Sequence, residues 1–448
     1  MKRLLDLLGI DRTIAYTLGG RGWNMLSGFF TLFLIVRFLN ADEQGYYYTF
    51  ASVLAMQIVF ELGMSYVVMQ FASHEMAHLH WTMSDTIDGE KTAKSRLSSL
   101  VLLVMKWYGA IAAFIILFIL PAGWYFFTVN HSGSSVAWQG PWIWLVISAS
   151  VNIYIMPLMA ILEGCGRIAE VARLRMIQNI VGSIAAWSIL VAGGGLYAAS
   201  VLNTGLAMTA LLWLWSTKRH FFKDLLSSEK STIGINWKTE IWPFQMKIAV
   251  SSLCGFFIFQ FFTPVIFAYR GVVEAGQIGM SINIANAVAN IAMAWMNSKA
   301  PRFGGLIAKK DYVALDAMFF STLWRSLAIL VFLSSVLCII NYGLHETGMK
   351  FASRFLDPGT FVLLMLATIM NYISYAQAAY LRAHKEDPFL AVSITCAVMI
   401  GISTLLLGRS YGADGAITGF FLICCFVGVG WGSKIFLSKR KEWQMKVD

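Results

Sequence analysis

The chain has 448 residues, of which 58% are hydrophobic and 13% are charged, and its mean hydropathy is +0.66. Because soluble domains carry roughly 25% charged residues, this composition excludes a soluble globular protein. Apolar stretches of about 20 residues recur along the chain, and each is long enough to cross a membrane as a helix. The sequence therefore predicts an all-α polytopic membrane protein.

Twelve membrane-spanning helices are predicted, six in each half of the chain. In the first half they cover residues 14–38, 46–69, 98–120, 141–162, 176–196 and 199–216. In the second half they cover residues 247–268, 277–298, 322–342, 360–381, 389–407 and 415–436. The connections between them are too short for a separate catalytic domain of typical size. We therefore expect the function to reside in the helices themselves.

The distribution of Lys and Arg predicts how these helices are oriented. The net charge of +10 comes from basic residues that flank apolar segments, so we expect a topology signal and no nucleic-acid partner. Of the 34 Lys and Arg residues, 27 fall on the two tails and the loops before odd-numbered helices, and four on the other face. Since cytoplasmic loops carry the excess of basic residues, both termini are predicted to be cytoplasmic.

The longest connection, residues 218–246, lies at the midpoint of the chain and carries several lysines. It is predicted to be a cytoplasmic linker between an N-terminal six-helix lobe, 1–217, and a C-terminal six-helix lobe, 247–448.

A short internal repeat supports this division into halves. The motif Glu43-Gln44-Gly45, before the second helix, recurs as Glu274-Ala275-Gly276 before the eighth helix. Because each half has an even number of helices, the halves would share one orientation and be related by an axis along the membrane normal. Chance matching between apolar sequences is the alternative explanation.

Three charged residues fall inside predicted helices at a similar depth. Arg21 lies in the first helix, Glu61 in the second and Lys106 in the third. Charges in a membrane are costly and usually face a wet cavity or a partner, so Arg21 and Lys106 are predicted to bind an anionic substrate. Glu61 would tune their field or carry a coupling ion. In the structural alternative, Glu61 neutralises a basic neighbour and Lys106 reaches toward the interface.

Amide side chains follow one face of the predicted eighth helix. Asn283, Asn286, Asn290 and Asn297 are spaced by three, four and seven residues, which aligns them on a helix. Such a stripe suits a hydroxyl-rich ligand, and it suits hydrogen bonding between helices equally well. Arg270, just beyond the seventh helix, is predicted to be an interfacial anchor or a substrate contact in an outer vestibule.

Motifs for enzymes, metals and cofactors are sparse. The glycines at 193–195 lack the Lys-Ser/Thr of an ATP site and are predicted to join two helices. His74, His78 and His80 have spacings that permit a metal, but a solvated loop is the favoured interpretation. The six cysteines lack zinc-ligand spacing and are not expected to form disulfides. We predict no enzyme activity, no cofactor and no metal site.

Several motifs together carry a family resemblance. They are Gly20-Arg21-Gly22, the run Glu43–Phe50, Phe60-Glu61-Leu62-Gly63, the second Glu-x-Gly step and the run Leu162–Arg167. With these motifs the chain resembles the polysaccharide-exporter, or O-antigen flippase, branch of the multidrug/oligosaccharidyl-lipid/polysaccharide (MOP) flippase superfamily. The resemblance implies two six-helix lobes around a central cavity. It also implies movement of undecaprenyl pyrophosphate-linked oligosaccharides to the periplasmic leaflet.

The resemblance thus implies a flippase of the bacterial inner membrane that serves surface polysaccharide or lipopolysaccharide biosynthesis. Its expected partners are the lipid-linked oligosaccharide, a coupling proton or sodium ion, and other polysaccharide assembly proteins. One alternative is an ion-coupled drug or cation antiporter of the same superfamily, which should prefer a cavity with excess carboxylates. The other is a membrane glycan polymerase or ligase, which usually needs a substantial outer loop.

Overall fold

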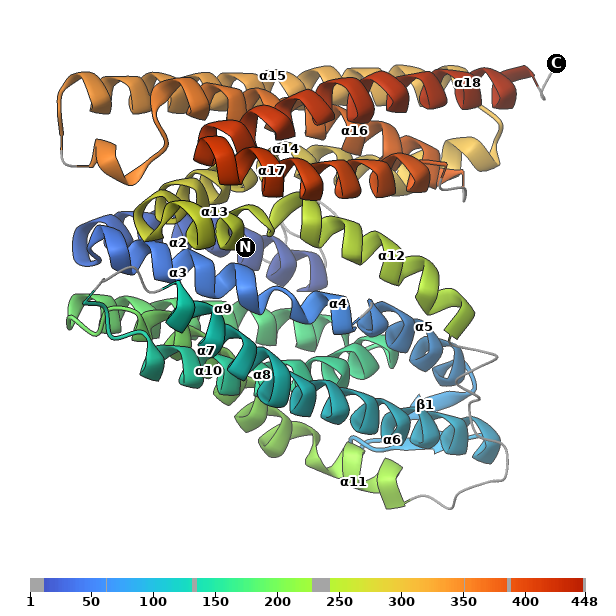
Figure 1. Cartoon of the computed structure of the whole chain (residues 1–448). Coiled ribbons are helices and arrows are strands. Elements are labelled where there is room, and N and C mark those ends of the chain that lie inside the picture. The colour runs from blue at the N-terminus through green and yellow to red at the C-terminus, as the bar shows by residue number, and fades with distance from the viewer. Residues whose placement is uncertain are drawn as a thin grey trace. The chain divides into compact units, whose positions relative to one another are not determined.

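The computed structural model describes residues 12–61, 63–130, 135–227, 242–349, 351–384 and 388–445. Within these ranges the chain is almost entirely helical, and the only strands form one short hairpin (Figure 1). Nine of the described helical segments are long and apolar enough to span a membrane, and one bent pair adds a tenth. The structure confirms an all-α polytopic membrane fold, and the count of twelve spans stays a prediction.

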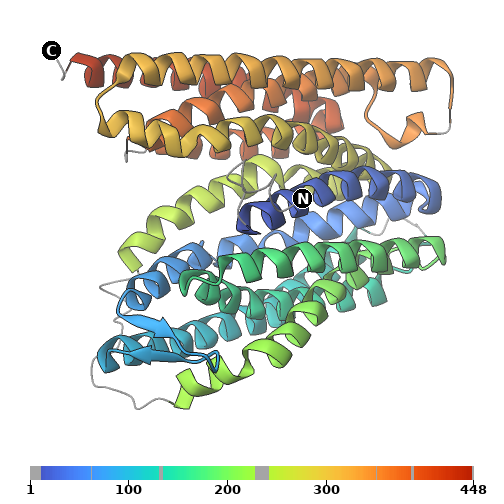
Figure 2. The ribbon, with the colours of Figure 1, turned by 180° about the vertical axis from the view of Figure 1, so that it is seen from behind.

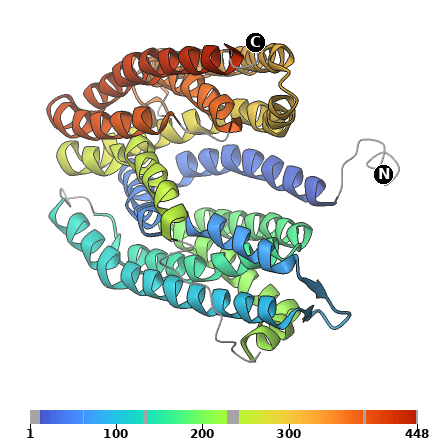
Figure 3. The same ribbon diagram turned by 90° about the vertical axis from the view of Figure 1, so that its right-hand side faces the viewer.

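The first half of the chain contains helices α2 to α11. Their bounds are α2 (Arg12–Phe38), α3 (Ala41–Leu54), α4 (Gln57–Glu61), α5 (Met64–Met76), α6 (Lys91–Phe114), α7 (Leu120–Val129), α8 (Gln139–Gly164), α9 (Ile168–Val191), α10 (Tyr197–Trp213) and α11 (Arg219–Ser227). π-Helical turns join α6 to α7 and α10 to α11. The antiparallel strands β1 (Leu79–Trp81) and β2 (Ile87–Gly89) connect α5 to α6, and Figure 3 shows this hairpin beyond the ends of both helices.

The helix predicted at 46–69 is broken in the structure. α5 begins directly after Gly63, whose φ of 66° is left-handed. The parts before and after this break, Ala41–Glu61 and Met64–Met76, are bent by 41°. A left-handed residue interrupts an α-helix, and glycine adopts this conformation without a Cβ clash. The break before α5 therefore follows from a single glycine, and a second interruption, at residues 55–56, separates α3 from α4.

The second half contains helices α12 to α18. Their bounds are α12 (Trp242–Phe259), α13 (Phe262–Arg270), α14 (Val272–Ala308), α15 (Tyr312–Glu346), α16 (Pro358–Ala383), α17 (Leu390–Ile423) and α18 (Gly432–Met445). The long helices α14 and α15 run side by side (Figure 2). α17 contains Gly412 at φ 66° and ψ −146°, which divides it between the predicted helices 389–407 and 415–436.

Contacts divide the chain into two compact units. Unit 1 comprises Met1–Glu43 and Leu54–Ser252, and unit 2 comprises Gln44–Val53 and Leu253–Asp448. In unit 1, α2 packs along α9, and α8 packs against α5, α6 and α10. In unit 2, α14 packs against α13, α15 and α16, and a buried core of Val288, Ala292, Leu330 and Tyr372 lies between α14, α15 and α16.

The lobe and linker boundaries deduced from the sequence stay predictions. The proposed linker, 218–246, begins at the end of a π-helical turn and continues as α11. Residues 228–241 of this linker lie outside the described residues.

Most of α3 belongs to unit 2 and packs closely against the start of α14. The Gln44 side-chain amide donates a hydrogen bond to the carbonyl of Gly276 at 3.0 Å. A Cβ at Gly45 would lie only 2.1 Å from the carbonyl oxygen of Val272, so a larger residue does not fit there. The glycine of the first Glu-x-Gly motif thus allows α3 to approach the start of α14 closely.

Candidate functional site

Glu61 ends α4 beside the helix break, and its carboxylate contacts hydroxyl groups. Ser65 Oγ donates a hydrogen bond to Glu61 Oε1 at 2.7 Å, and the Tyr108 hydroxyl donates to the same oxygen at 3.3 Å. One turn before Glu61, the buried Oε1 of Gln57 accepts no hydrogen bond from a described residue. Four polar side chains therefore gather on α4, α5 and α6 within an apolar part of unit 1.

Arg21 and Lys106 are exposed, and neither forms an ion pair with a described residue. The Trp23 indole donates to Ser183 of α9 at 3.0 Å, and Arg21 lies outside this packed face of α2. On α6, Tyr108 turns toward Glu61, whereas Lys106 is about 200° away around the helix axis. Contacts in the described structure thus join Glu61 to hydroxyls, and they do not join the three predicted charges to one another.

The predicted amide stripe lies on α14 in unit 2. Asn283 and Asn290 are exposed and Asn286 is half-buried, and none of these side chains bonds to a described residue. Asn297 instead accepts a hydrogen bond from the Tyr375 hydroxyl of α16 at 2.6 Å. Hydrogen bonding between helices therefore explains Asn297, and ligand binding by the other three amides stays a prediction.

Arg270 lies at the end of α13 and is paired with an acidic residue. Its Nε lies 3.6 Å from Glu274 Oε2, and the Arg270 side chain is 40% exposed. Glu274 Oε1 in turn accepts the backbone N–H of Ala413 at 2.5 Å. The charge of Arg270 is therefore partly matched within unit 2, and its role in substrate binding stays a prediction.

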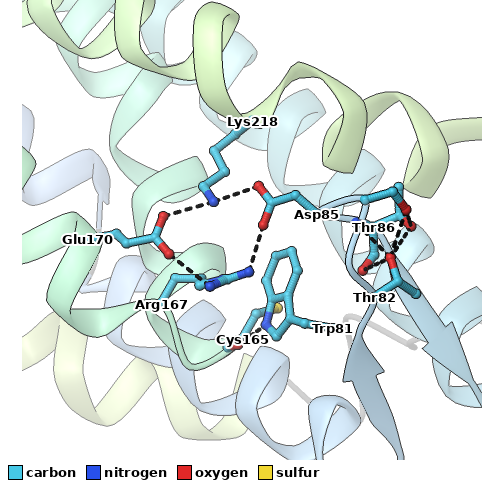
Figure 4. A network of polar contacts seen from close by, with 9 residues as sticks. Trp81, Thr82, Asp85, Thr86, Cys165, Arg167, Glu170 and Lys218 are labelled. Carbon is cyan, nitrogen blue, oxygen red and sulfur yellow. Dashed lines mark hydrogen bonds and ion pairs between the residues drawn. The ribbon is translucent and has the colours of Figure 1, made fainter.

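A closed network of four charged side chains, which sequence reasoning missed, lies at one end of unit 1 (Figure 4). Lys218 Nζ lies 2.7 Å from Asp85 and 2.8 Å from Glu170. Arg167 bridges the same two carboxylates, at 2.6 Å from Asp85 and 2.9 Å from Glu170. Each cation contacts both anions. Two cations and two anions together leave the network with no net charge.

Trp81 of the β hairpin lies beside this network. Its indole N–H donates to the carbonyl of Cys165 at 2.8 Å, and the Arg167 guanidinium lies 4.2 Å from its ring centroid. The network therefore ties the hairpin to the turn between α8 and α9 and to the end of the π-helical turn that follows α10. The only local signal was an Arg167–Glu170 spacing of three residues, which fits an ion pair on a helix.

The described residues contain no group of three His, Cys, Asp or Glu side chains that could hold a metal ion. Of the three histidines in the cytoplasmic loop predicted between the second and third helices, His78 has an acidic neighbour. Its Nδ1 lies 3.7 Å from Glu90, and both side chains are more than half exposed. The structure thus describes a solvated pair at this position.

Neither a protein-family model nor a curated protein matches this sequence. Solved structures, in contrast, match nearly its whole length. An inward-facing multidrug resistance MATE family transporter of the MOP superfamily has a TM-score of 0.71 at 14% identity, covering 94% of this chain and 95% of that chain. The eukaryotic MATE transporter AtDTX14 gives 0.61 at 11% identity, covering 97% and 98%. The lipid II flippase MurJ gives 0.57 at 13% identity, covering 97% and 90%.

At sequence identities this low, the similarity shows a shared fold and no more. It does not separate the polysaccharide-exporter branch from the other branches, so that assignment stays a prediction. The chain has the fold of the MOP superfamily transporters.

Proposed function

We propose that the protein moves a lipid-linked oligosaccharide, of the undecaprenyl pyrophosphate type, from the cytoplasmic to the periplasmic leaflet of a bacterial inner membrane. A pyrophosphate-bearing sugar cannot cross hydrocarbon unaided, because its charges and hydroxyls lose water without compensation. The protein would supply an enclosed polar path by alternating access. The lipid tail would stay in the bilayer, and the product would serve the synthesis of a surface polysaccharide.

The observation that carries this proposal is that Arg21 and Lys106, on apolar helices of unit 1, are exposed and that neither forms an ion pair with a described residue. A charge left in lipid costs at least roughly 2.5–3.5 kcal/mol at the centre of a helix, so a wet cavity is the more stable environment for both. Guanidinium and ammonium groups form short, charge-assisted hydrogen bonds with phosphate oxygens. These two side chains are therefore proposed to attract the pyrophosphate.

Asn283, Asn286 and Asn290 of α14 are proposed to receive the sugar. Each amide can donate two hydrogen bonds and accept two, which suits hydroxyl groups that both donate and accept. Their side chains bond to no described residue, so this capacity is not already used within the fold. Arg270 is proposed to assist Asn283 in binding the substrate, and the ion pair with Glu274 reduces the electrostatic field of Arg270.

Glu61 is proposed to be the ion-sensitive group that couples transport to a proton gradient. Its described partners are the hydroxyls of Ser65 and Tyr108, and both can rotate to serve a carboxylate or a neutral carboxylic acid. Arginine or lysine beside it would instead stabilise the charged form strongly. A hydroxyl environment thus permits both protonation states during a transport cycle.

The same carboxylate favours a second candidate function, the ion-coupled export of a drug or organic cation. Several solved structures with this fold are described as MATE transporters. In that case Glu61 would contact the cation directly, and the basic residues Arg21 and Lys106 would lower the affinity for it. The two functions therefore predict opposite effects when these basic residues are neutralised.

Gene deletion in the native bacterium separates the candidates. For the flippase, the lipid-linked oligosaccharide should be assembled but remain inaccessible to glycan-modifying enzymes added to the periplasmic side of spheroplasts. A plasmid copy should restore access, and drug susceptibility should not change. If the intermediate reaches the periplasm normally in a strain without a redundant exporter, the flippase proposal is wrong. Increased drug susceptibility in that strain would support the antiporter.

A further inference from the structure

The glutamate of the second Glu-x-Gly motif fills a gap at the kink of α17. Glu274, in the first turn of α14, accepts the backbone N–H of Ala413 at 2.5 Å. The preceding residue, Gly412, has a left-handed φ of 66°. A Cβ at Gly412 would lie 2.1 Å from Glu274 Oε1, so the carboxylate occupies the space that a larger side chain would need.

This contact has a clear physical effect on the second part of α17. The first backbone N–H groups of a helix have no partner within that helix, and they form its positive end. Glu274 supplies both an acceptor and a negative charge at this end, from a different helix. The backbone N–H that follows Gly412 is therefore bonded by a side chain 139 positions earlier.

The glutamate of the first motif has a matching place in unit 1. Glu43, in the first turn of α3, uses Oε2 to accept the backbone N–H of Asn40 at 2.9 Å. Its other oxygen, Oε1, lies 3.0 Å from where a Cβ at Gly195 would be, and Gly195 has a φ of 53°. Gly195 belongs to the turn between α9 and α10, the last two spans predicted in the first half.

The two glutamates thus share three features. Each begins a Glu-x-Gly motif, each lies in the first turn of its helix, and each carboxylate lies against a left-handed glycine between the last two spans predicted for its half. A chance repeat of three residues does not account for this shared placement, because Gly195 and Gly412 lie outside the motifs. Glu274 also bonds to the backbone after its glycine, whereas Glu43 bonds to Asn40 and lies beside Gly195. The contacts therefore assign the repeat a structural purpose that its sequence alone did not reveal.

We propose that Glu43 and Glu274 are equivalent positioning residues, each of which holds the turn between the last two spans of its own half. A second step rests on the proposed function. In the transport cycle, each carboxylate keeps the turn of its own half in one conformation. Loss of either carboxylate would loosen the turn and slow transport, and loss of Glu274 would also remove the ion-pair partner of Arg270.

Hydrogen–deuterium exchange of the purified full-length protein in detergent tests the first step. Glu274→Ala should raise the exchange rate of the amides just after Gly412 by about five- to tenfold, the loss of one typical hydrogen bond. Val273→Ala, in the same turn of α14, is the matched control and should leave those rates unchanged. Glu274→Gln keeps an acceptor oxygen and the fold, so it should give a smaller increase. Wild-type rates in both glutamate variants would overturn the assignment of Glu274.

Glu43 has a sharper control, because its two oxygens face different segments. Glu43→Ala should raise exchange both at the start of α3 and at residues 194–198. Asn40→Ala removes the reciprocal contact at the start of α3 and should leave 194–198 unchanged. If both variants raise exchange at 194–198 equally, or neither does, Glu43 does not hold that turn and the proposed equivalence fails.

The transport step is tested separately, in cells carrying the deletion and a plasmid copy. At wild-type expression levels, Glu43→Ala and Glu274→Ala should slow the delivery of lipid-linked oligosaccharide, and Val273→Ala should not. Faster exchange with unchanged delivery would overturn the second step and leave the flippase proposal intact. Failure of the flippase proposal itself would be evident from the deletion strain, whereas exchange does not depend on any substrate.

Discussion

Lys218 and Asp85 form an ion pair of 2.7 Å although they lie 133 positions apart in the chain. Lys218 is only 3% exposed, while Asp85 is 32% exposed. Removal of the ammonium would leave Asp85 and Glu170 with Arg167 as their remaining shared cation. The pair therefore joins the β hairpin to the end of the π-helical turn after α10, and its loss should be felt in the stability of unit 1.

We expect Lys218→Ala to lower the free energy of unfolding by about 1–3 kcal/mol. The value lies between those of exposed and buried ion pairs, because Lys218 is buried while Asp85 is partly exposed. Thermal unfolding of the purified protein in detergent measures the change. Lys223→Ala, on the exposed face of α11, should change stability by less than about 0.5 kcal/mol. Equal effects of the two variants would contradict a special role for the network.

Arg21→Ala and Lys106→Ala should each insert normally and slow the delivery of lipid-linked oligosaccharide at least about tenfold, the loss of one charge-assisted contact. Arg21→Lys and Lys106→Arg keep the charge and should retain most of the rate. Lys441→Ala, on exposed α18, serves as the control. Delivery is measured in the deletion strain at matched expression, and wild-type rates for both alanine variants would remove these residues from the site.

Glu61→Gln should abolish the dependence of transport on a proton gradient, because the amide keeps the size of the side chain and cannot titrate. The assay uses proteoliposomes loaded with lipid-linked oligosaccharide from the deletion strain, with and without an imposed pH difference. Tyr108→Phe removes the longer of the two hydroxyl contacts to Glu61 and the Ser65–Tyr108 hydrogen bond, and it should preserve the dependence. A Glu61→Gln protein that still responds fully to the gradient would show that coupling resides elsewhere.

The predicted orientation can be read from single cysteines at exposed positions. With the native cysteines replaced by serine, Thr347→Cys should react with an impermeant thiol reagent in intact spheroplasts, since it follows α15 on the predicted periplasmic side. Ser227→Cys, at the end of α11, should react only after the membrane is opened. The reverse pattern would invert the topology and place both termini outside the cytoplasm.

Asp357 should make the start of α16 sensitive to acid. Its carboxylate accepts the backbone N–H of Thr360 at 3.1 Å. Burial favours a higher pKa, but the hydrogen bonds from Thr360 outweigh it, so the pKa of Asp357 lies below its usual 3.8. A lowered pKa in the folded state stabilises fully above the unfolded value, and this contribution is lost as the pH falls through the folded value.

Amide exchange at Thr360, corrected for the intrinsic rate, should therefore increase below about pH 4, near the reference pKa of aspartate. In Asp357→Ala it should be high at every pH, with a loss of about 1 kcal/mol from the missing cap. Asp311→Ala removes the corresponding cap of α15 and should leave α16 unchanged. Acid-insensitive exchange in the wild type would contradict the assigned cap.

The helices were accessible from sequence because a long apolar segment is a local property of the chain. The prediction of 141–162, for example, falls inside α8 with two residues to spare at each end. The break at Gly63 was missed because one glycine barely changes the mean hydropathy of a window. Glycine permits a left-handed φ but does not require one, so the residue type alone did not identify the break.

The polar contacts were harder to predict because they join distant segments. Lys218 and Asp85 each look like solvated loop residues until the hairpin brings them together. For the repeated motif, sequence comparison identified Glu43 and Glu274 but not the glycines that they meet. For Glu61, a basic neighbour was only the structural alternative, and the described structure instead provides hydroxyls from Ser65 and Tyr108.

The packing of α2 on α9 limits how Arg21 can be reoriented. The Trp23 indole donates to Ser183 at 3.0 Å, and the Trp187 indole donates in the opposite sense to Thr31 at 2.8 Å. These two bonds, one donated from each helix, hold α2 against α9 at two different positions along their axes. Sliding by one turn, about 5.4 Å, or rolling about the axis would break both. Arg21 can therefore change its surroundings only if α9 moves together with α2, or if α2 bends on the N-terminal side of Trp23.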